Sequence, residues 1–168
     1  MRGSDIVLAS APRGAYLEGY ASEILSPGQI VQIQRGVALR DGSNGAGRMT
    51  WEKCDSSGGV GSGTGSGTDG YGLLAVVDIN YGLGKIATDA YAAGDRVFLY
   101  VPASSEEINV MVDSTLGSIE IGDTLKPKDG DGTLQEASSS DSYIPFQSLE
   151  ADGSISVDTL IACVATGK

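Results

Sequence analysis

The stretch from Arg96 to Val112, RVFLYVPASSEEINVMV, decides the fold class. Its first part, Arg96–Val101, is β-branched and aromatic, and its last part, Glu107–Val112, alternates polar and apolar residues. Both patterns are typical of β-strands. An earlier apolar run, Leu73–Ile79, has the composition of a buried strand. This region therefore predicts short strands rather than helices.

The rest of the chain continues in the same way. Glycine accounts for 25 of the 168 residues, which disfavours long helices and suits many short strands and turns. Only Ile86–Ala93 could form a helix, and it is short. The predicted fold class is all-β, a small β-barrel or a sandwich. The further strand candidates are Ile30–Ile33, Met49–Glu52, Thr124–Leu125, Thr133–Leu134, Tyr143–Leu149 and Thr159–Ala165.

We place the β-rich body at residues 26–168. Two segments differ from it in composition: the residues that precede it and one loop within it. Residues 1–25 show no sustained hydrophobic period and predict an extended N-terminal arm, with one short strand at Ile6–Ala9. The alternative is that the arm completes the barrel as a strand or ties protomers together. Residues 56–70 consist mostly of Gly, Ser and Thr, and a segment with so little to bury predicts a flexible loop.

Composition and charge exclude several classes of function. The chain has no histidine, which removes the Ser-His-Asp triad, the Cys-His dyad and His-ligated zinc. Its net charge of −11 disfavours binding to nucleic acid, and no apolar run is long enough to span a membrane. The two cysteines, Cys54 and Cys163, are too few for a disulfide framework, which favours synthesis in a reducing cytoplasm.

The motifs in the sequence indicate turns rather than chemistry. Gly65–Gly70 matches GxGxxG but does not lie between a strand and a helix, and Gly82–Ala87 is followed by too few residues for such a helix. Asp129–Thr133 lacks the later ligands of a calcium loop, so it indicates a hairpin, with an adventitious ion site as the alternative. We expect no catalytic, cofactor-binding or metal-binding residues, although a Ser-Lys enzyme stays open as a weaker hypothesis.

A local pattern of glycine, a polar residue and then a strand occurs three times, in Pro27–Val31, Ala93–Val97 and Ile121–Leu125. Glycine supplies the positive φ of a turn, and the Asp or Gln side chain can bind nearby amides. We interpret these segments as turns that lead into strands and not as a repeat of about 20–50 residues.

The segment Asp89–Val97, DAYAAGDRV, resembles the central motif of the tailed-bacteriophage capsid decoration proteins, also called structural cement proteins. Members of that family read as a strand, a Gly-Lys turn, this motif, a strand ending near Pro, and a hairpin containing DGDGTL. Gly84-Lys85, Val101-Pro102 and Ile121–Leu134 match that order here, and Glu18–Tyr20 and Ser26–Gln29 also fit. This chain lacks the Gly-Asp that the family usually carries shortly after the central strand.

The resemblance implies a β-rich, non-enzymatic protein without cofactors, attached to the outer surface of the virion. The implied partners are the major capsid protein, whose subunits it would bridge and stabilise, and further copies of itself in a homotrimer. The alternative from the residues is a β-barrel module that binds carbohydrate or a metal ion. Arginine and tyrosine are enriched at protein interfaces. The candidate capsid or protomer contacts are therefore those in the predicted arm: Arg2, Arg13, Tyr16 and Tyr20.

Overall fold

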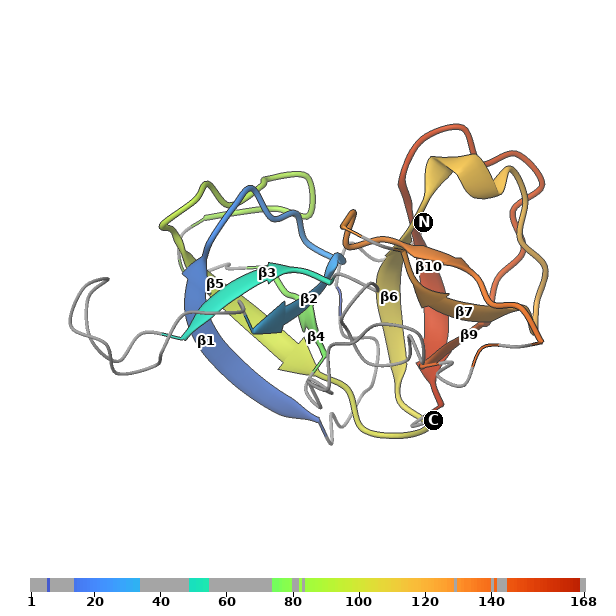
Figure 1. The fold of residues 1–168 in the computed structure, drawn as a ribbon, viewed down its shortest axis with the longest axis horizontal. Helices are drawn as coiled ribbons and strands as arrows, with labels where there is room; N and C mark the ends of the chain where they lie inside the picture. Colours follow the sequence, from blue (N-terminus) through green and yellow to red (C-terminus); the bar gives the residue numbers. More distant parts are fainter. Residues whose placement is uncertain are drawn as a thin grey trace.

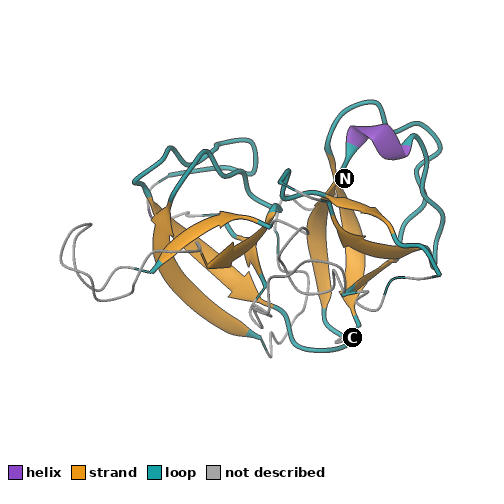
Figure 2. Cartoon of the chain, in the orientation of Figure 1, coloured by secondary structure: helices purple, strands orange, loops and turns teal. Residues whose placement is uncertain are grey.

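The computed structural model describes residue 6 and residues 14–33, 49–54, 74–79, 82, 84–128, 130–139, 141 and 145–166. The described chain is nearly all β, with ten strands and one short 3-10 turn, η2 (Ser114–Leu116) (Figure 2). The predicted all-β barrel fold class is therefore confirmed. None of the helices in this part of the chain is long and apolar enough to cross a membrane.

The strands close into two barrels that follow each other along the sequence and lie side by side (Figure 1). The N-terminal barrel has the strand order β1-β3-β2-β4-β5. Its strands are β1 (Ala15–Ala21), β2 (Ile30–Ile33), β3 (Thr50–Lys53), β4 (Ala75–Val77) and β5 (Arg96–Val101). Apolar residues that alternate along these strands point inward, and Trp51 is the largest side chain of the core they form.

The C-terminal barrel has the strand order β10-β6-β8-β7-β9. Its strands are β6 (Glu107–Val112), β7 (Thr124–Pro127), β8 (Leu134–Glu136), β9 (Phe146–Ser148) and β10 (Thr159–Ala165). The apolar positions of the alternating Glu107–Val112 sequence face the interior, as the sequence pattern predicts.

The two barrels have the same topology. In each, the first strand pairs parallel with the third and antiparallel with the fifth, and the second strand pairs with the third and the fourth. The loops agree as well. The N–H of Gly28 donates to the Val77 carbonyl at 2.8 Å, and the N–H of Gly122 donates to the Ser148 carbonyl at 2.9 Å. The chain is therefore a tandem repeat of one barrel, which the sequence analysis did not predict.

The three glycine turns have a common geometry, which a fourth turn shares. Each is a type II turn in which the third residue has positive φ and the N–H of the fourth donates to the carbonyl of the first. The side chain of the fourth residue accepts a hydrogen bond from the N–H of the first. The interpretation as turns leading into strands is confirmed. The four turns are Ser26–Gln29, Ala92–Asp95, Ala103–Glu106 and Glu120–Asp123.

Backbone hydrogen bonds and a shared core join the barrels. The N–H of Ile30 donates to the Gly132 carbonyl at 2.7 Å, and the N–H of Gly130 donates to the Cys54 carbonyl at 3.0 Å. Ile30, Val76 and Tyr100 lie in register across β2, β4 and β5 on the outside of the N-terminal barrel, and all three belong to the hydrophobic cluster of the C-terminal barrel. The two barrels therefore form one body.

The structure differs from the sequence-based expectation at two segments, and a third expected segment lies outside the described residues. Residues 15–21 form β1, a wall of the N-terminal barrel, so this part of the predicted arm is not a free extension. Ile86–Ala93, the helix candidate, contains a turn capped by Asp89 and the bridge from Tyr91 to Leu25 instead of a helix. The predicted flexible loop, residues 56–70, lies outside the described residues.

Candidate interface on the outer face of the N-terminal barrel

The outer face of β1 and β5 gathers aromatic and charged side chains. Along β1, the inward positions are small or apolar, and the outward positions are Tyr16, Glu18 and Tyr20. The antiparallel register sets Tyr16 opposite Tyr100, Glu18 opposite Phe98, and Tyr20 opposite Arg96. We call the four residues Glu18, Tyr20, Arg96 and Phe98 the strand face.

Tyr16 lies beside this face at the rim of the inter-barrel junction. Tyr16 is 57% exposed, and its ring packs on the ring of the fully buried Tyr100, with centroids 4.8 Å apart and planes tilted by 54°. Partial burial raises the pKa of the Tyr16 phenol, and Asp78 and Glu106 add to this effect. Tyr16 is therefore an anchored aromatic side chain with one accessible surface.

Tyr100 connects the N-terminal barrel to the turn that leads into β6. Its hydroxyl accepts the N–H of Gly14 at 2.9 Å and donates to the carboxylate of Glu106. Burial and this hydrogen bond raise the pKa of Tyr100. Glu106 is only 2% exposed and also accepts the N–H of Ala103 at 2.7 Å. The hydrogen bonds satisfy the buried carboxylate, so it holds the inter-barrel turn in place.

An ion pair and a cation–π contact order the strand face. The guanidinium of Arg96 pairs with the Glu18 carboxylate and lies 5.8 Å from the centroid of the Phe98 ring. The hydrogen bond from Arg96 to Glu18 raises the pKa of Arg96. An exposed pair of this kind contributes little to stability, but it holds the guanidinium over an aromatic ring. Arginine and aromatic side chains in such an arrangement are typical of protein interfaces.

The structure brings together two of the four residues that the sequence singled out. Tyr16 and Tyr20 both point outward from β1, whereas Arg2 and Arg13 lie outside the described residues. The sequence analysis missed Arg96 and Phe98. Their alternation in RVFLYV was the available signal, but only the pairing of β1 with β5 brings them next to the tyrosines.

The N-terminal segment also contributes to the core. Ile6 is 1% exposed and belongs to the hydrophobic cluster of the C-terminal barrel, and its carbonyl accepts the N–H of Asn109 at 2.7 Å. Together with β1, this contact agrees with the alternative in which the N-terminal segment completes a barrel.

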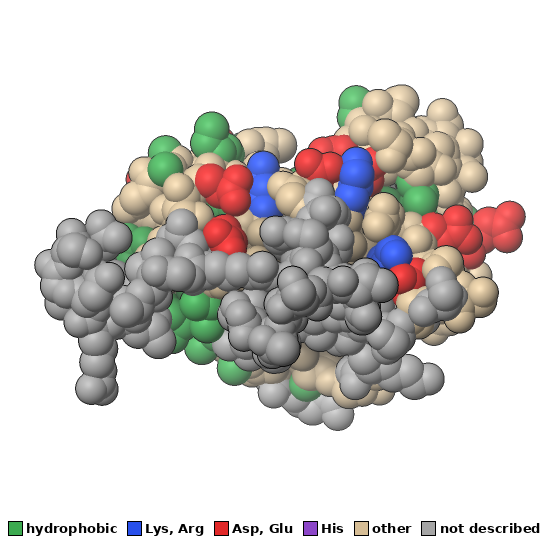
Figure 3. Space-filling view, in the orientation of Figure 1, with side chains coloured by type: hydrophobic (Ala, Val, Ile, Leu, Met, Phe, Trp, Pro, Cys, Tyr) green, Lys and Arg blue, Asp and Glu red, His purple; other side chains and the backbone are tan. Residues whose placement is uncertain are grey.

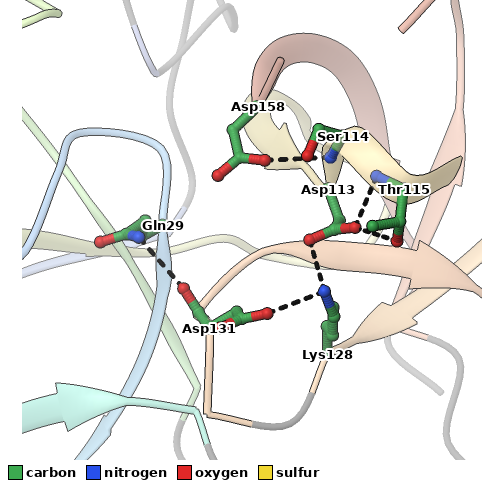
Figure 4. Close-up of polar contacts among 7 residues, drawn as sticks. All are labelled: Gln29, Asp113, Ser114, Thr115, Lys128, Asp131 and Asp158. Atoms are coloured by element: carbon green, nitrogen blue, oxygen red, sulfur yellow. Dashed lines mark hydrogen bonds and ion pairs between the residues drawn. The ribbon is translucent and has the colours of Figure 1, made fainter. Parts of the chain in front are cut away.

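A polar network lies at the junction between the barrels (Figure 4). The Lys128 ammonium is 2.7 Å from Asp113 Oδ2 and 2.8 Å from Asp131 Oδ2. Burial opposes ionisation of Asp113, but hydrogen bonds from Lys128 and Thr115 outweigh it, so the pKa of Asp113 is lower than usual. The two carboxylates raise the pKa of Lys128. The Lys128 ammonium thus bridges the carboxylates of Asp113 and Asp131.

The same network reaches across to the N-terminal barrel. Gln29 donates from Nε2 to the carbonyl of Asp131 at 3.1 Å, and its Oε1 accepts the N–H of Ser26 at 2.8 Å. On the other side, the N–H of Ser114 donates to Asp158 Oδ1 at 2.9 Å. The bond from Gln29 fixes the hairpin between β7 and β8 against the turn that leads into β2, which is a structural role (Figure 4). The hairpin interpretation of residues 129–133 is confirmed at its described positions.

In the part of the chain that the structure describes, neither a metal-binding cluster nor an exposed thiol occurs. Among the described residues there is no group of three or more Cys, Asp or Glu that could hold a metal ion. Cys54 and Cys163 are buried, and burial raises the pKa of the Cys163 thiol to about 12, which suppresses the reactive thiolate. Acidic side chains are spread over both barrels on the face seen in Figure 3, with Lys and Arg between them.

Fold and surface together define a class: an all-β protein built from two tandem five-stranded barrels, with an aromatic and charged face on one barrel. Neither a protein-family model nor a curated protein sequence matches the chain. A solved structure does: the crystal structure of head fiber gp8.5 N base in bacteriophage phi29. The two chains are 12% identical with a TM-score of 0.52, and the match covers 91% of this chain and 94% of that chain. At this identity the likeness is one of fold.

Proposed function

We propose that this protein is a non-enzymatic structural component of a bacteriophage head, bound to the outer surface of the virion. The observation that carries the proposal is the likeness to the phi29 head fiber base, because it extends over both barrels and nearly all of both chains. The resemblance of Asp89–Val97 to the capsid decoration family supports the same role independently.

The residues of the motif Asp89–Val97 form turns and a buried contact that explain their types. Asp89 accepts the N–H of Ile86 at 2.9 Å, and Asp95 accepts the N–H of Ala92 at 2.9 Å, so each carboxylate closes one turn. Tyr91 is fully buried, and its hydroxyl donates to the Asp78 carbonyl at 2.8 Å. The motif thus positions β5 in the N-terminal barrel. Because these residue types are needed for the turns and the buried tyrosine, we expect the decoration proteins that carry the motif to share this barrel.

The departure from the family pattern after β5 is compensated. Ser105 stands in the position of the missing glycine and has a φ of 67°, and Glu106 takes the capping role of the missing aspartate. The turn geometry is the same as in the three glycine turns. This position therefore does not weaken the proposal.

In the proposed role, the protein bridges neighbouring subunits of the major capsid protein and thereby stabilises the shell. A ligand that binds only the assembled state shifts the equilibrium toward it by mass action. The candidate contacts with capsid or protomer are Arg2, Arg13, Tyr16 and Tyr20, and the oligomer implied by the resemblance is a homotrimer. Several copies held together would bind the head with avidity.

The test compares expanded heads with and without the protein. We expect the purified protein to bind heads stoichiometrically, seen by co-sedimentation, and to raise the temperature at which the heads release DNA. The control is an unrelated acidic β-protein of similar size, which should do neither. Failure to bind heads, together with unchanged heat release, would overturn the proposal.

A further inference from the structure

The contact between the two barrels joins two different surfaces. The turn Ser26–Gln29 of the N-terminal barrel packs on the outer face of β6 and β10 of the C-terminal barrel. The N–H of Met111 donates to the Gly28 carbonyl at 2.9 Å. A Cβ atom added to Gly28 would lie 2.2 Å from Cδ2 of Leu160, so glycine is needed for this close approach. Met111 and Leu160 are opposite each other in the register of β6 and β10.

Because the barrels repeat one topology, each side of this contact has a counterpart in the other barrel. Ala21 and Val112 each end the first strand of their barrel and pair with its third strand, so these two residues correspond. The residues that precede them, Tyr20 and Met111, therefore correspond as well. Tyr20 is opposite Arg96 just as Met111 is opposite Leu160. The pair that receives a turn in the C-terminal barrel thus corresponds to Tyr20 and Arg96 on the strand face.

The docking turn also has a counterpart, in the turn Glu120–Asp123. Both turns are type II, and both have their glycine N–H bonded to the last residue of the fourth strand. Their second residues differ in exposure: Pro27 is buried at the junction, whereas Ile121 is 71% exposed. Ile121 thus lies exposed at the tip of a turn, between the carboxylates of Glu120 and Asp123. An apolar side chain in this position is typical of a docking surface whose partner is absent.

We propose that the turn Glu120–Asp123 of one copy docks on the strand face of a second copy, at Tyr20 and Arg96. The chemistry of the two surfaces is complementary. The turn offers an apolar tip flanked by Glu120 and Asp123. The face offers two aromatic rings and the Arg96 guanidinium, which the Glu18 carboxylate pairs with and holds in place. The contact is made by side chains, because the N–H of Tyr20 already donates to the Met49 carbonyl and Gln147 already binds the Gly122 carbonyl.

Such a contact is heterologous, since each copy carries both surfaces and uses one toward each neighbour. Heterologous contacts close into rings or continue into fibres. The contact proposed here would join the copies of the homotrimer described under the proposed function, and it rests on that function to this extent. It is tested in solution without heads, so its failure leaves head binding untouched, and failure of head binding leaves it standing.

The test uses single-surface variants of the full chain. Ile121→Asp places a charge at the turn tip, and Arg96→Glu reverses the charge of the strand face. Val157→Asp is the matched control, because Val157 is 66% exposed on the same barrel as Ile121 and outside the proposed contact. Sedimentation velocity over a range of concentrations measures the mass. We expect the native protein and the control to assemble reversibly, and each surface variant to self-associate at least tenfold more weakly.

A mixing experiment tests whether the turn of one copy meets the strand face of another. The Ile121→Asp variant keeps an intact face, and the Arg96→Glu variant keeps an intact turn, so together they can form one productive contact and no more. We expect an equimolar mixture to give heterodimers that do not grow further. If copies instead paired face to face or turn to turn, the same mixture would not recover the native contact.

A charge exchange tests whether the two surfaces meet as proposed. Adding Glu120→Lys to Arg96→Glu restores opposite charges and should regain part of the lost association. Melting temperatures equal to that of the native protein show that the variants are folded. The proposal is overturned if the native protein is monomeric at every concentration, if both surface variants assemble normally, or if the mixture yields only monomers.

Discussion

Gly28→Ala tests how strongly the fold depends on the close approach of the two barrels. Two costs add at this position. Gly28 has a φ of 86°, in the left-handed region, where an L-residue costs about 1–2 kcal/mol. The new methyl group would also lie 2.2 Å from Leu160 Cδ2, and overpacking of this kind costs about 1–3 kcal/mol. We expect a total loss of about 2–5 kcal/mol in the free energy of unfolding.

Two matched substitutions separate these costs. Gly94 has a φ of 87°, and a Cβ atom added there would meet no other atom within 4 Å, so Gly94→Ala carries the backbone cost alone. Gly122, with a φ of 97°, is the counterpart of Gly28 in the repeat, and the atom nearest to an added Cβ is Gln147 Nε2 at 3.9 Å. The excess loss in Gly28→Ala over both controls is the cost at the junction, about 1–3 kcal/mol.

The measurement is equilibrium unfolding in urea with calorimetry in parallel. For a chain of this size, 1 kcal/mol corresponds to about 2–4 °C in Tm, so the junction cost is resolvable. Equal losses in Gly28→Ala and Gly94→Ala, within about 0.5 kcal/mol, would refute the view that Leu160 and Gly28 form a tight contact.

Three further predictions concern other parts of the chain. Ser105→Gly relieves the positive φ at that turn and should raise the stability by about 0.5–1 kcal/mol in urea unfolding; a loss would contradict the strain. Lys126 lowers the pKa of Asp141 to about 2. The ion pair therefore stabilises the fold above the ordinary carboxyl pKa of about 4, and this stabilisation is lost as the pH falls toward 2. Asp141→Asn should therefore flatten the dependence of Tm on pH in that range, and an unchanged profile would exclude the ion pair. Ile6→Ala should cost about 2–4 kcal/mol because Ile6 is buried, whereas a neutral effect in calorimetry would place it outside the core.

The strands with strong apolar patterns could be predicted from the sequence. Arg96–Val101, Glu107–Val112 and Thr159–Ala165 agree with β5, β6 and β10 at both ends. Their β-branched and alternating residues bury one face of a sheet, which is the signal that a local pattern carries.

β1 escaped prediction for a physical reason. One of its inward positions is Gly19, where a Cβ atom would lie 2.4 Å from the indole of Trp51. Trp51, fully buried on β3, fills the space that a side chain of β1 would otherwise take. Apart from Leu17, the inward residues of β1 are therefore small, and the sustained apolar alternation that marks a strand is missing from the sequence.

The repeat and the strand face depend on long-range pairing and could not be predicted from local patterns. Corresponding positions in the two barrels share turn chemistry, such as the glycines at 28 and 122, but few core residues. Tyr16 and Tyr20 were found because both are tyrosines in one short segment. Arg96 joins Tyr20 only through the antiparallel register of β1 and β5, across a long intervening stretch of chain.

The two barrels differ in the outward residues that lie in register across their second, fourth and fifth strands. This difference limits how copies can associate. On the N-terminal barrel the row Ile30, Val76 and Tyr100 is apolar and buried against the C-terminal barrel. The corresponding row of the C-terminal barrel is Thr124, Gln147 and Val164, which is more polar and partly exposed. A second copy that docks at Glu120–Asp123 therefore finds the turn contact without the broad apolar surface behind it. The contact between copies should be smaller than the one within a chain, and small interfaces are weak and reversible. An assembly of this kind gains strength when a surface holds the copies side by side, because their effective concentration is then high.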